Sequence, residues 1–238
     1  MGNTDILRQM IADSNRIVFF GGAGVSTESG IPDFRSVDGL YNQKYRYPPE
    51  TILSRSYFLK YTEDFYTFYK EKLLYPSAKP NSCHRALALL ENKGKLSSVV
   101  TQNVDGLHQA AGSKNVLELH GSVHRNFCML CGKSYNLSYI ISSPGVPTCS
   151  CGGTIKPDVV LYEEGLDNKV LNSAISAISK ADMLIVGGTS LVVYPAAGLV
   201  DFYNGNRLVL INKSSTSLDK KADLVINDSI GEVFSYYV

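Results

Sequence analysis

Four of the five cysteines in this sequence lie within one short segment. Cys128 and Cys131 form a first close pair, and Cys149 and Cys151 form a second pair after 17 intervening residues. Two such pairs can direct four sulfurs at one tetrahedral zinc ion, whereas two disulfides or buried thiols are the alternatives. We expect zinc, because cysteines separated by one residue bridge each other poorly and no secretory signal precedes them. Four sulfur ligands leave no position open for water, so this metal would be structural.

A glycine-rich loop is the second feature with chemical potential. An apolar run at residues 16–20 leads into Gly21-Gly22-Ala23-Gly24-Val25-Ser26-Thr27, where backbone N–H groups can hold a phosphate. Thr27 replaces the third glycine of the dinucleotide-binding fingerprint, and no acidic residue ends a second strand about 20 positions later, as hydride-transfer domains require. Taken alone, the loop could also be a plain tight turn.

Phe34 and Arg35 follow this loop closely. An aromatic ring can cover a flat heterocycle or shield a reactive carbon from water, and an arginine can hold a diphosphate or a carboxylate with two hydrogen bonds. A core phenylalanine and a surface arginine are the alternative interpretation. The position of the pair next to a possible phosphate loop favours a role in ligand binding.

Polar residues follow several other apolar runs. Residues 98–101 precede Gln102-Asn103-Val104-Asp105, residues 182–187 precede Gly188-Thr189-Ser190, and residues 207–211 precede Asn212. Open α/β sheets bind ligands at the carboxyl ends of their strands, so these loops together favour a long ligand such as a dinucleotide. His120 is a candidate general base because an imidazole titrates near neutral pH, although a lone histidine is more often structural.

The elements that position these loops alternate along the chain. Strand-like runs occupy residues 16–20, 98–101, 159–162, 182–187, 207–211 and 223–226, and helical patterns occupy residues 5–13, 62–74, 82–92, 168–180 and 195–203. This alternation predicts an α/β fold with a mainly parallel sheet covered by helices. Two segments interrupt it, the Tyr- and Phe-rich residues 31–80 and the cysteine-bearing residues 126–153, and we expect them to form a smaller lobe.

Composition excludes several classes of protein. The 238 residues are 44% hydrophobic and 19% charged, which is typical of a globular chain and not of a disordered or collagen-like one. The 23 basic and 22 acidic residues give a net charge of +1, so no broad field attracts nucleic acid or an anionic membrane. The apolar runs are far shorter than the about 20 residues of a membrane-spanning helix. We therefore expect a soluble, cytoplasmic protein without nucleic-acid or membrane partners.

The motifs, in their order along the chain, resemble those of the sirtuins, a family of NAD-dependent protein lysine deacylases. The resemblance extends from about residue 16 to the C-terminus, and the short chain is similar to the compact bacterial members. The segments that carry it are 22–26, 30–35, 101–108, 119–121, 188–190 and 211–212, together with the two cysteine pairs.

The resemblance implies a Rossmann-like parallel sheet domain with a smaller zinc-binding and helical lobe inserted. The large domain would comprise residues 1–33, 81–123 and 155–238. Within the smaller lobe, residues 34–80 would form the helical module and residues 124–154 the zinc-binding module. NAD and an acyl-lysine would meet in a cleft between the two parts.

The resemblance also implies the reaction. The acetyl group of a protein acetyl-lysine would be transferred to ADP-ribose with release of nicotinamide, so NAD would be consumed as a co-substrate, which accounts for the missing hydride-transfer acid. His120 would deprotonate a ribose hydroxyl, with Asn103 and Asp105 as further catalytic residues. The implied NAD site consists of Gly22, Ala23, Gly24, Thr27, Phe34, Arg35, Gln102, Asn103, Val104, Asp105, His120, Gly188, Thr189, Ser190, Asn212, Asp228 and Ile230.

Substrate binding is implied for the segment after the zinc module. An acetyl-lysine peptide would add as a strand, through backbone hydrogen bonds, between residues 159–162 and the segment that follows Ser190. The predicted contact residues are Val159, Val160, Leu161 and Tyr162. Glu163 departs from the family, because relatives often have Gly there. A second departure concerns Tyr66-Thr67-Phe68-Tyr69, which lacks the Arg of members that prefer succinyl- or malonyl-lysine. We therefore expect deacetylation over desuccinylation, with Lys70 as the nearby cation.

Two other functions use the same features. A protein mono-ADP-ribosyltransferase would transfer the ribosyl group of NAD to a protein side chain, and a non-catalytic module would only bind NAD or ADP-ribose. Asn103, Asp105 and His120 together argue against the binding module, which needs no base. A zinc-ribbon nucleic-acid binder is disfavoured, because residues 126–154 contain a single basic residue, Lys133.

Overall fold

The computed structural model describes residues 2–36 and 39–238. Its larger sheet has the strand order β3-β2-β1-β7-β8-β9, and all neighbouring strands are parallel. From β1 the chain adds two strands on one side and then three on the other, which is the order of a dinucleotide-binding Rossmann fold. The predicted α/β, Rossmann-like class is therefore confirmed. The strands are β1 (Ile17–Gly21), β2 (Leu96–Thr101), β3 (Val116–Glu118), β7 (Met183–Gly187), β8 (Leu208–Ile211) and β9 (Leu224–Ile226).

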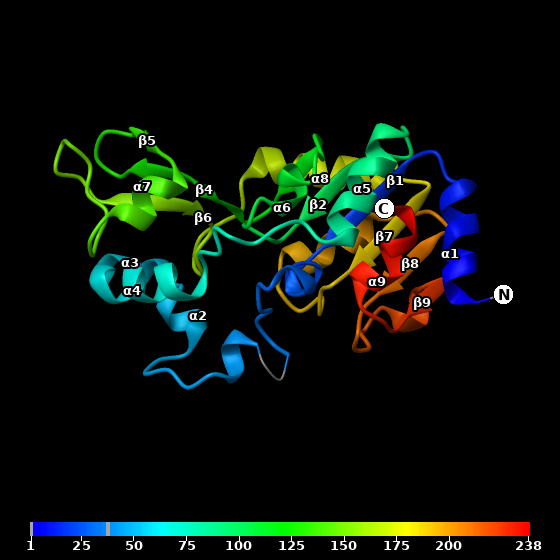
Figure 1. Cartoon of the computed structure of the whole chain (residues 1–238), viewed down its shortest axis with the longest axis horizontal. Coiled ribbons are helices and arrows are strands. Elements are labelled where there is room, and N and C mark those ends of the chain that lie inside the picture. Colours follow the sequence, from blue (N-terminus) through cyan, green and yellow to red (C-terminus); the bar gives the residue numbers. More distant parts are fainter. Residues whose placement is uncertain (1, 37–38) are drawn as a thin grey trace.

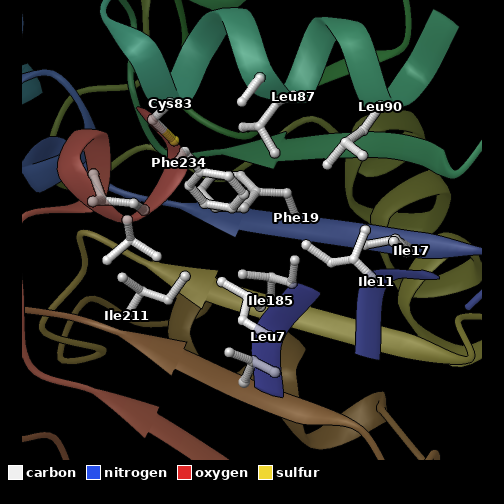
Figure 2. Packing of buried hydrophobic residues seen from close by; sticks show 14 of the residues in the cluster. Leu7, Ile11, Ile17, Phe19, Cys83, Leu87, Leu90, Ile185, Ile211 and Phe234 are labelled. Atoms are coloured by element: carbon white, nitrogen blue, oxygen red, sulfur yellow. The ribbon is translucent and has the colours of Figure 1, made fainter. Parts of the chain in front are cut away.

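Helices cover both faces of this sheet, which explains why its central strands are continuous apolar runs. Successive side chains of β1 point to opposite faces, so Phe19 and Phe20 belong to different hydrophobic clusters. Figure 2 shows Phe19 packed against Phe234 and close to Leu87 of the helix above the sheet. On the other face, Phe20 packs in a cluster with Ala174 and further residues of the helices there.

Capping residues mark where the covering helices begin. The helix α5 (Ser82–Asn92) starts after Asn81, and α8 (Asn168–Ser179) starts after Asp167; each capping side chain accepts hydrogen bonds from two N–H groups of the first turn. Both helices match their predicted positions, as does α1 (Asn3–Ala12). In the described ranges, no helix has the length and hydrophobicity needed to cross a membrane. Further helices beside this sheet include α6 (Leu107–Ala110), α9 (Ile230–Phe234) and a 3₁₀ helix at Ala196–Phe202, where the sequence predicts a helix.

A smaller antiparallel sheet, β5-β4-β6, lies at the far end of the molecule from α1 (Figure 1). Its strands are β4 (Gly121–Cys128), β5 (Ser134–Tyr135) and β6 (Ile155–Val159). The sequence predicts a strand of the main sheet at residues 159–162, and this prediction is wrong, because β6 ends at Val159 and pairs with β4. The burial of β6 alternates along the strand, as in an antiparallel sheet packed on one face, whereas the apolar run that suggested a central strand begins only where β6 ends.

An aromatic cluster joins the small sheet to the helices beneath it in Figure 1. Phe58, Phe65, Tyr66 and Tyr69 are buried there and contact one another edge-on or stacked. The aromatic segment that the sequence sets apart therefore supplies a second hydrophobic core, while its domain boundaries stay a prediction. The helices of this part are α2 (Pro49–Ile52), α3 (Arg55–Lys60), α4 (Thr62–Lys72) and α7 (Leu137–Ser142).

Candidate active site

The polar loops singled out in the sequence gather at one edge of the large sheet. Because the strands are parallel, their carboxyl ends point the same way, and each loop follows one of these ends. The glycine loop follows β1, residues 102–105 follow β2, residues 188–190 follow β7 and Asn212 follows β8. His120 lies two residues after the end of β3. Parallel topology thus unites side chains from distant parts of the chain.

The glycine loop and the loop after β7 fit closely against each other. The N–H of Gly24 donates to the carbonyl of Gly188 at 2.8 Å, and a Cβ added to Gly24 would lie 2.8 Å from the Cα of Gly188. A Cβ on Gly22 would lie 2.7 Å from the Cβ of Thr189. Gly188 also has a φ of 60°, in the left-handed region that favours glycine. The close approach of the two loops, and not a tight turn alone, explains these glycines.

A hydroxyl that is not among the predicted site residues joins two of the predicted catalytic residues. The buried Ser26 Oγ donates to Oδ2 of Asp105 at 2.7 Å and accepts from Nδ2 of Asn103 at 3.1 Å. The other carboxylate oxygen of Asp105 accepts the N–H of Leu107 at 2.9 Å. Ser26 therefore fixes the Asn103 amide and the Asp105 carboxylate relative to each other. Ser26 was visible in the glycine loop, but nothing local distinguished it from Thr27, which bonds back into its own loop.

His120 has a defined tautomer. Its Nδ1 lies 3.0 Å from the carbonyl oxygen of Gln102. A carbonyl only accepts hydrogen bonds, so Nδ1 carries the proton and Nε2 keeps a lone pair. Burial lowers the pKa of His120 below its ordinary value of 6.5, while the hydrogen bond to Gln102 opposes this shift. The ring is consequently neutral at pH 7, with Nε2 as a base.

Gln102, Thr189 and Asn212 are linked in series by hydrogen bonds along the same edge. Gln102 Nε2 donates to Thr189 Oγ1 at 3.0 Å, and the N–H of Thr189 donates to Asn212 Oδ1 at 2.9 Å. The Nδ2 of Asn212 is buried and has no hydrogen-bond partner in the part of the chain that the structure describes. A buried donor without a partner costs about 1–3 kcal/mol. This amide is therefore suited to a polar group of a ligand.

The remaining residues predicted to bind the cofactor stand apart from these hydrogen bonds. Phe34 contacts Tyr41 edge-on with ring centres 5.6 Å apart, and the guanidinium of Arg35 lies 5.0 Å from the same ring. Asp228 is exposed at the end of β9, whereas Ile230 is buried in the core of the large sheet. Of the others, Ala23, Thr27 and Val104 are half buried and Ser190 is exposed.

The four clustered cysteines converge on one point. Their Sγ atoms all lie within 4.8 Å of one another, with Cys128 and Cys151 3.5 Å apart and Cys131 and Cys149 3.6 Å apart. Four sulfurs at about 2.3 Å from a tetrahedral zinc are about 3.8 Å apart, whereas disulfide sulfurs are about 2.05 Å apart. Each cysteine of the chain is free, and two N–H groups point at the Cys128 sulfur. The donor set and its spacing fit a tetrahedral metal.

The segment predicted to bind the substrate links β4 and β6 to the helices of the small lobe. The N–H of Val160 donates to the carbonyl of His120 at 3.0 Å. Tyr162 donates its N–H to Leu53 and accepts from the N–H of Arg55, both at 3.0 Å. Leu161 and Val159 are buried in the aromatic core. Residues 159–162 therefore connect the histidine directly to α3.

Tyr66 and Tyr69, at the two ends of the segment in which the predicted Arg is missing, are buried. Tyr66 donates its hydroxyl to the carbonyl of Ile155, and Tyr69 stacks on Phe65 with ring centres 5.5 Å apart. The ammonium of Lys70 donates to two carbonyls of residues 143–145, at 2.5 and 2.8 Å. Lys70 is thus engaged with a surface loop.

A pair of buried histidines was not anticipated. The rings of His84 and His108 are 4.7 Å apart, and both are buried. Nε2 of His84 and both ring nitrogens of His108 have no hydrogen-bond partner among residues 2–36 and 39–238. Burial lowers the pKa of His84 to about 4 and that of His108 well below its ordinary value. Both rings are therefore neutral at pH 7.

Known proteins are similar to this chain in sequence and in fold. The family model described as Sir2 matches residues 22–195. A relative named NAD-dependent protein deacetylase from Clostridium perfringens is 64% identical over 231 residues, which cover 95% of both chains. One of the same name from Clostridium acetobutylicum is 62% identical over 231 residues, which cover 95% of this chain and 94% of the relative. A solved Sir2 structure with a deacetylated p53 peptide and 3′-O-acetyl-ADP-ribose has a TM-score of 0.90 and 39% identity, and the match covers 99% of this chain and 96% of that one. The resemblance to the sirtuins is confirmed, and the chain belongs to the Sir2 family.

Proposed function

We propose that this protein is an NAD-dependent protein lysine deacetylase, which transfers the acetyl group of acetyl-lysine to ADP-ribose and releases nicotinamide. The observation that carries the proposal is a neutral His120 with a basic Nε2, held by Gln102 next to the hydrogen bonds of Ser26, Asn103 and Asp105. Relatives at 55–64% identity are named for this activity, which agrees with the predicted function and enzyme class.

The two sides of the sheet edge offer different chemistry to the dinucleotide. Backbone N–H groups of the loop containing Ala23, with the guanidinium of Arg35, suit the diphosphate. The unpaired Nδ2 of Asn212 would donate a hydrogen bond to the adenosine half. The exposed Asp228 carboxylate could accept a hydrogen bond from a ribose hydroxyl. Gln102 and its neighbours through residue 105 would line the nicotinamide half.

NAD supplies a glycosidic carbon that becomes electrophilic as nicotinamide leaves, and the acetyl oxygen of the substrate attacks this carbon. The protein's part is to position the partners and to move a proton. His120 Nε2 can accept a proton from a ribose hydroxyl, because Nδ1 is already protonated toward Gln102. Asn103 and Asp105 would hold the ribose and nicotinamide groups, and Ser26 fixes both side chains beforehand.

The four cysteines would hold a structural zinc ion. Cys128, Cys131, Cys149 and Cys151 leave no vacant ligand position, so the metal would organise the small lobe and would not take part in the chemistry. Cys128 and Cys149 also belong to the aromatic core, so the metal site and the packing of that core depend on each other.

The acyl group accepted is expected to be acetyl or another uncharged chain. A succinyl carboxylate needs a cationic partner when it is buried. Tyr69 occupies the family position of that partner, and the Lys70 ammonium is bonded to carbonyls of residues 143–145. Backbone pairing of the peptide along residues 159–162 would tolerate different flanking sequences.

Mass spectrometry of an acetyl-lysine peptide, incubated with and without NAD, tests the function. We expect deacetylated peptide and free nicotinamide only with NAD, and neither product with the His120→Ala variant at comparable stability. Covalent labelling of protein by NAD without acyl-lysine would instead identify an ADP-ribosyltransferase. NAD binding with an unchanged peptide would identify a binding module.

A further inference from the structure

Glu163 adopts a backbone conformation that is unusual for its residue type. Its φ is 75°, in the left-handed region. The N–H of Glu164 donates to the carbonyl of Leu161 at 3.0 Å and closes a four-residue turn in which Glu163 is the third residue. A positive φ at this position is the property of a type II turn, where glycine is preferred. A side chain with a Cβ is disfavoured there, so Glu163 needs a compensating interaction.

The carboxylate of Glu163 provides that interaction. It accepts hydrogen bonds from the N–H and from the hydroxyl of Ser56, each at 2.8 Å. Ser56 lies in the first turn of α3, where N–H groups have no partner within the helix. Hydrogen bonds to a carboxylate are stronger than those between neutral groups. A glycine could adopt the turn but could not make either bond.

The neighbours of Glu163 attach the same turn to α3. The Glu164 carboxylate accepts from Arg55 at 3.1 Å and from Lys156 at 3.0 Å. Tyr162 pairs with the main chain on both sides of Ser54. Residues 161–164 and the start of α3 therefore form one hydrogen-bonded unit, to which Glu163 contributes its two bonds to Ser56.

Main-chain groups next to these attachments are available to a ligand. Within the described ranges, the carbonyl of Val160 has no hydrogen-bond partner, and neither the N–H nor the carbonyl of Glu163 has one. Val160 and Glu163 also line one surface hollow of about 530 Å³. Unpaired main-chain N–H and carbonyl groups are those with which an added strand would pair.

We propose that Glu163 is a positioning residue for the acyl-peptide substrate. Its bonds to Ser56 hold the turn against α3, so that the unpaired main-chain groups of Val160 and Glu163 keep the directions that an extended peptide requires. This inference rests on the proposed deacetylase function. Because Glu163 touches no reacting group, it acts on peptide binding and not on NAD binding or on the chemical step.

Steady-state deacetylation, with the concentrations of acetyl-lysine peptide and NAD varied separately, tests the proposal. Glu163→Ala removes both bonds, and we expect the peptide KM to rise about fivefold while the NAD KM and kcat stay within about twofold. Glu163→Gln keeps a polar partner for both Ser56 groups and should restore the peptide KM. Glu163→Gly relieves the backbone but loses the bonds, so its peptide KM should rise as well. Glu63→Ala, at an exposed position of α4, is the matched control and should leave the peptide KM unchanged.

The outcomes separate this role from the function on which it rests. An active wild-type enzyme whose peptide KM is unchanged in Glu163→Ala would overturn the positioning role and leave the deacetylase assignment intact. If the wild type does not turn over the peptide, calorimetric peptide binding makes the same comparison, and equal Kd values overturn the role. Should Glu163→Ala fold poorly, Ser56→Ala removes one bond from the other side. A rise of the peptide KM of about twofold in that variant supports the role, and no rise contradicts it.

Discussion

Removal of the proposed zinc ion from the cysteine cluster should unfold the small lobe and leave the large sheet folded. In the folded lobe four sulfurs lie within 4.8 Å of one another, and two of them, on Cys128 and Cys149, belong to the aromatic core. Structural zinc binding contributes about 10–16 kcal/mol of folding free energy in small metal modules. This is of the same size as the about 5–15 kcal/mol that stabilises a whole domain, so we do not expect the aromatic packing alone to keep the small lobe folded.

Hydrogen exchange with mass spectrometry, combined with a colorimetric zinc assay, measures this effect by region. In Cys149→Ser, or after chelation, we expect zinc loss and loss of amide protection in β4 and β6, with protection in β1 and β7 retained. Cys83→Ala is the matched control, because Cys83 is buried in the large core away from the cluster and its removal should leave the zinc content unchanged. Zinc-free protein with full protection in β4 and β6 would refute a structural role for the metal.

Four further outcomes follow from the geometry. Burial lowers the pKa of His120, and only the neutral ring is a base, so kcat/KM should be level near pH 7 and fall only below pH 6.5. A pH–rate profile in which kcat/KM already falls with decreasing pH above pH 7 would contradict this. Gly24→Ala places a Cβ 2.8 Å from the Cα of Gly188, so the NAD KM in steady-state assays should rise at least about tenfold with the peptide KM little changed. Because Tyr69 replaces a cationic partner, acetyl-lysine peptide should react at least about tenfold faster than succinyl-lysine peptide in paired assays, and the opposite order would refute this account. An unfolded histidine takes up a proton below about pH 6.5, whereas folded His84 does so only below about pH 4, so unfolding binds a proton between these pH values. The free energy of unfolding should therefore fall by about 3 kcal/mol from pH 6.5 to 4 through this residue alone. Urea titrations, with the zinc content checked at each pH, measure this fall.

The sequence by itself determined the local features of this protein. Continuous apolar runs identified five of the six strands of the large sheet, and capping residues such as Asn81 and Asp167 marked two helix starts correctly. The spacing of the cysteines indicated the cluster whose sulfurs converge in the structure. Hydrophobic periodicity, capping and short ligand spacings depend on residues a few positions apart, so one sequence is enough to read them.

Tertiary structure decided which distant residues meet. Ser26 reaches Asp105 and Gln102 reaches Thr189 only because the parallel strands β1, β2 and β7 are neighbours and end at the same edge. The pairing of β6 with β4, and the bonds of Glu163 to Ser56, likewise depend on elements far apart along the chain. Strand order and the packing of whole elements set these contacts, and no local pattern in a single sequence encodes the distance between two remote side chains.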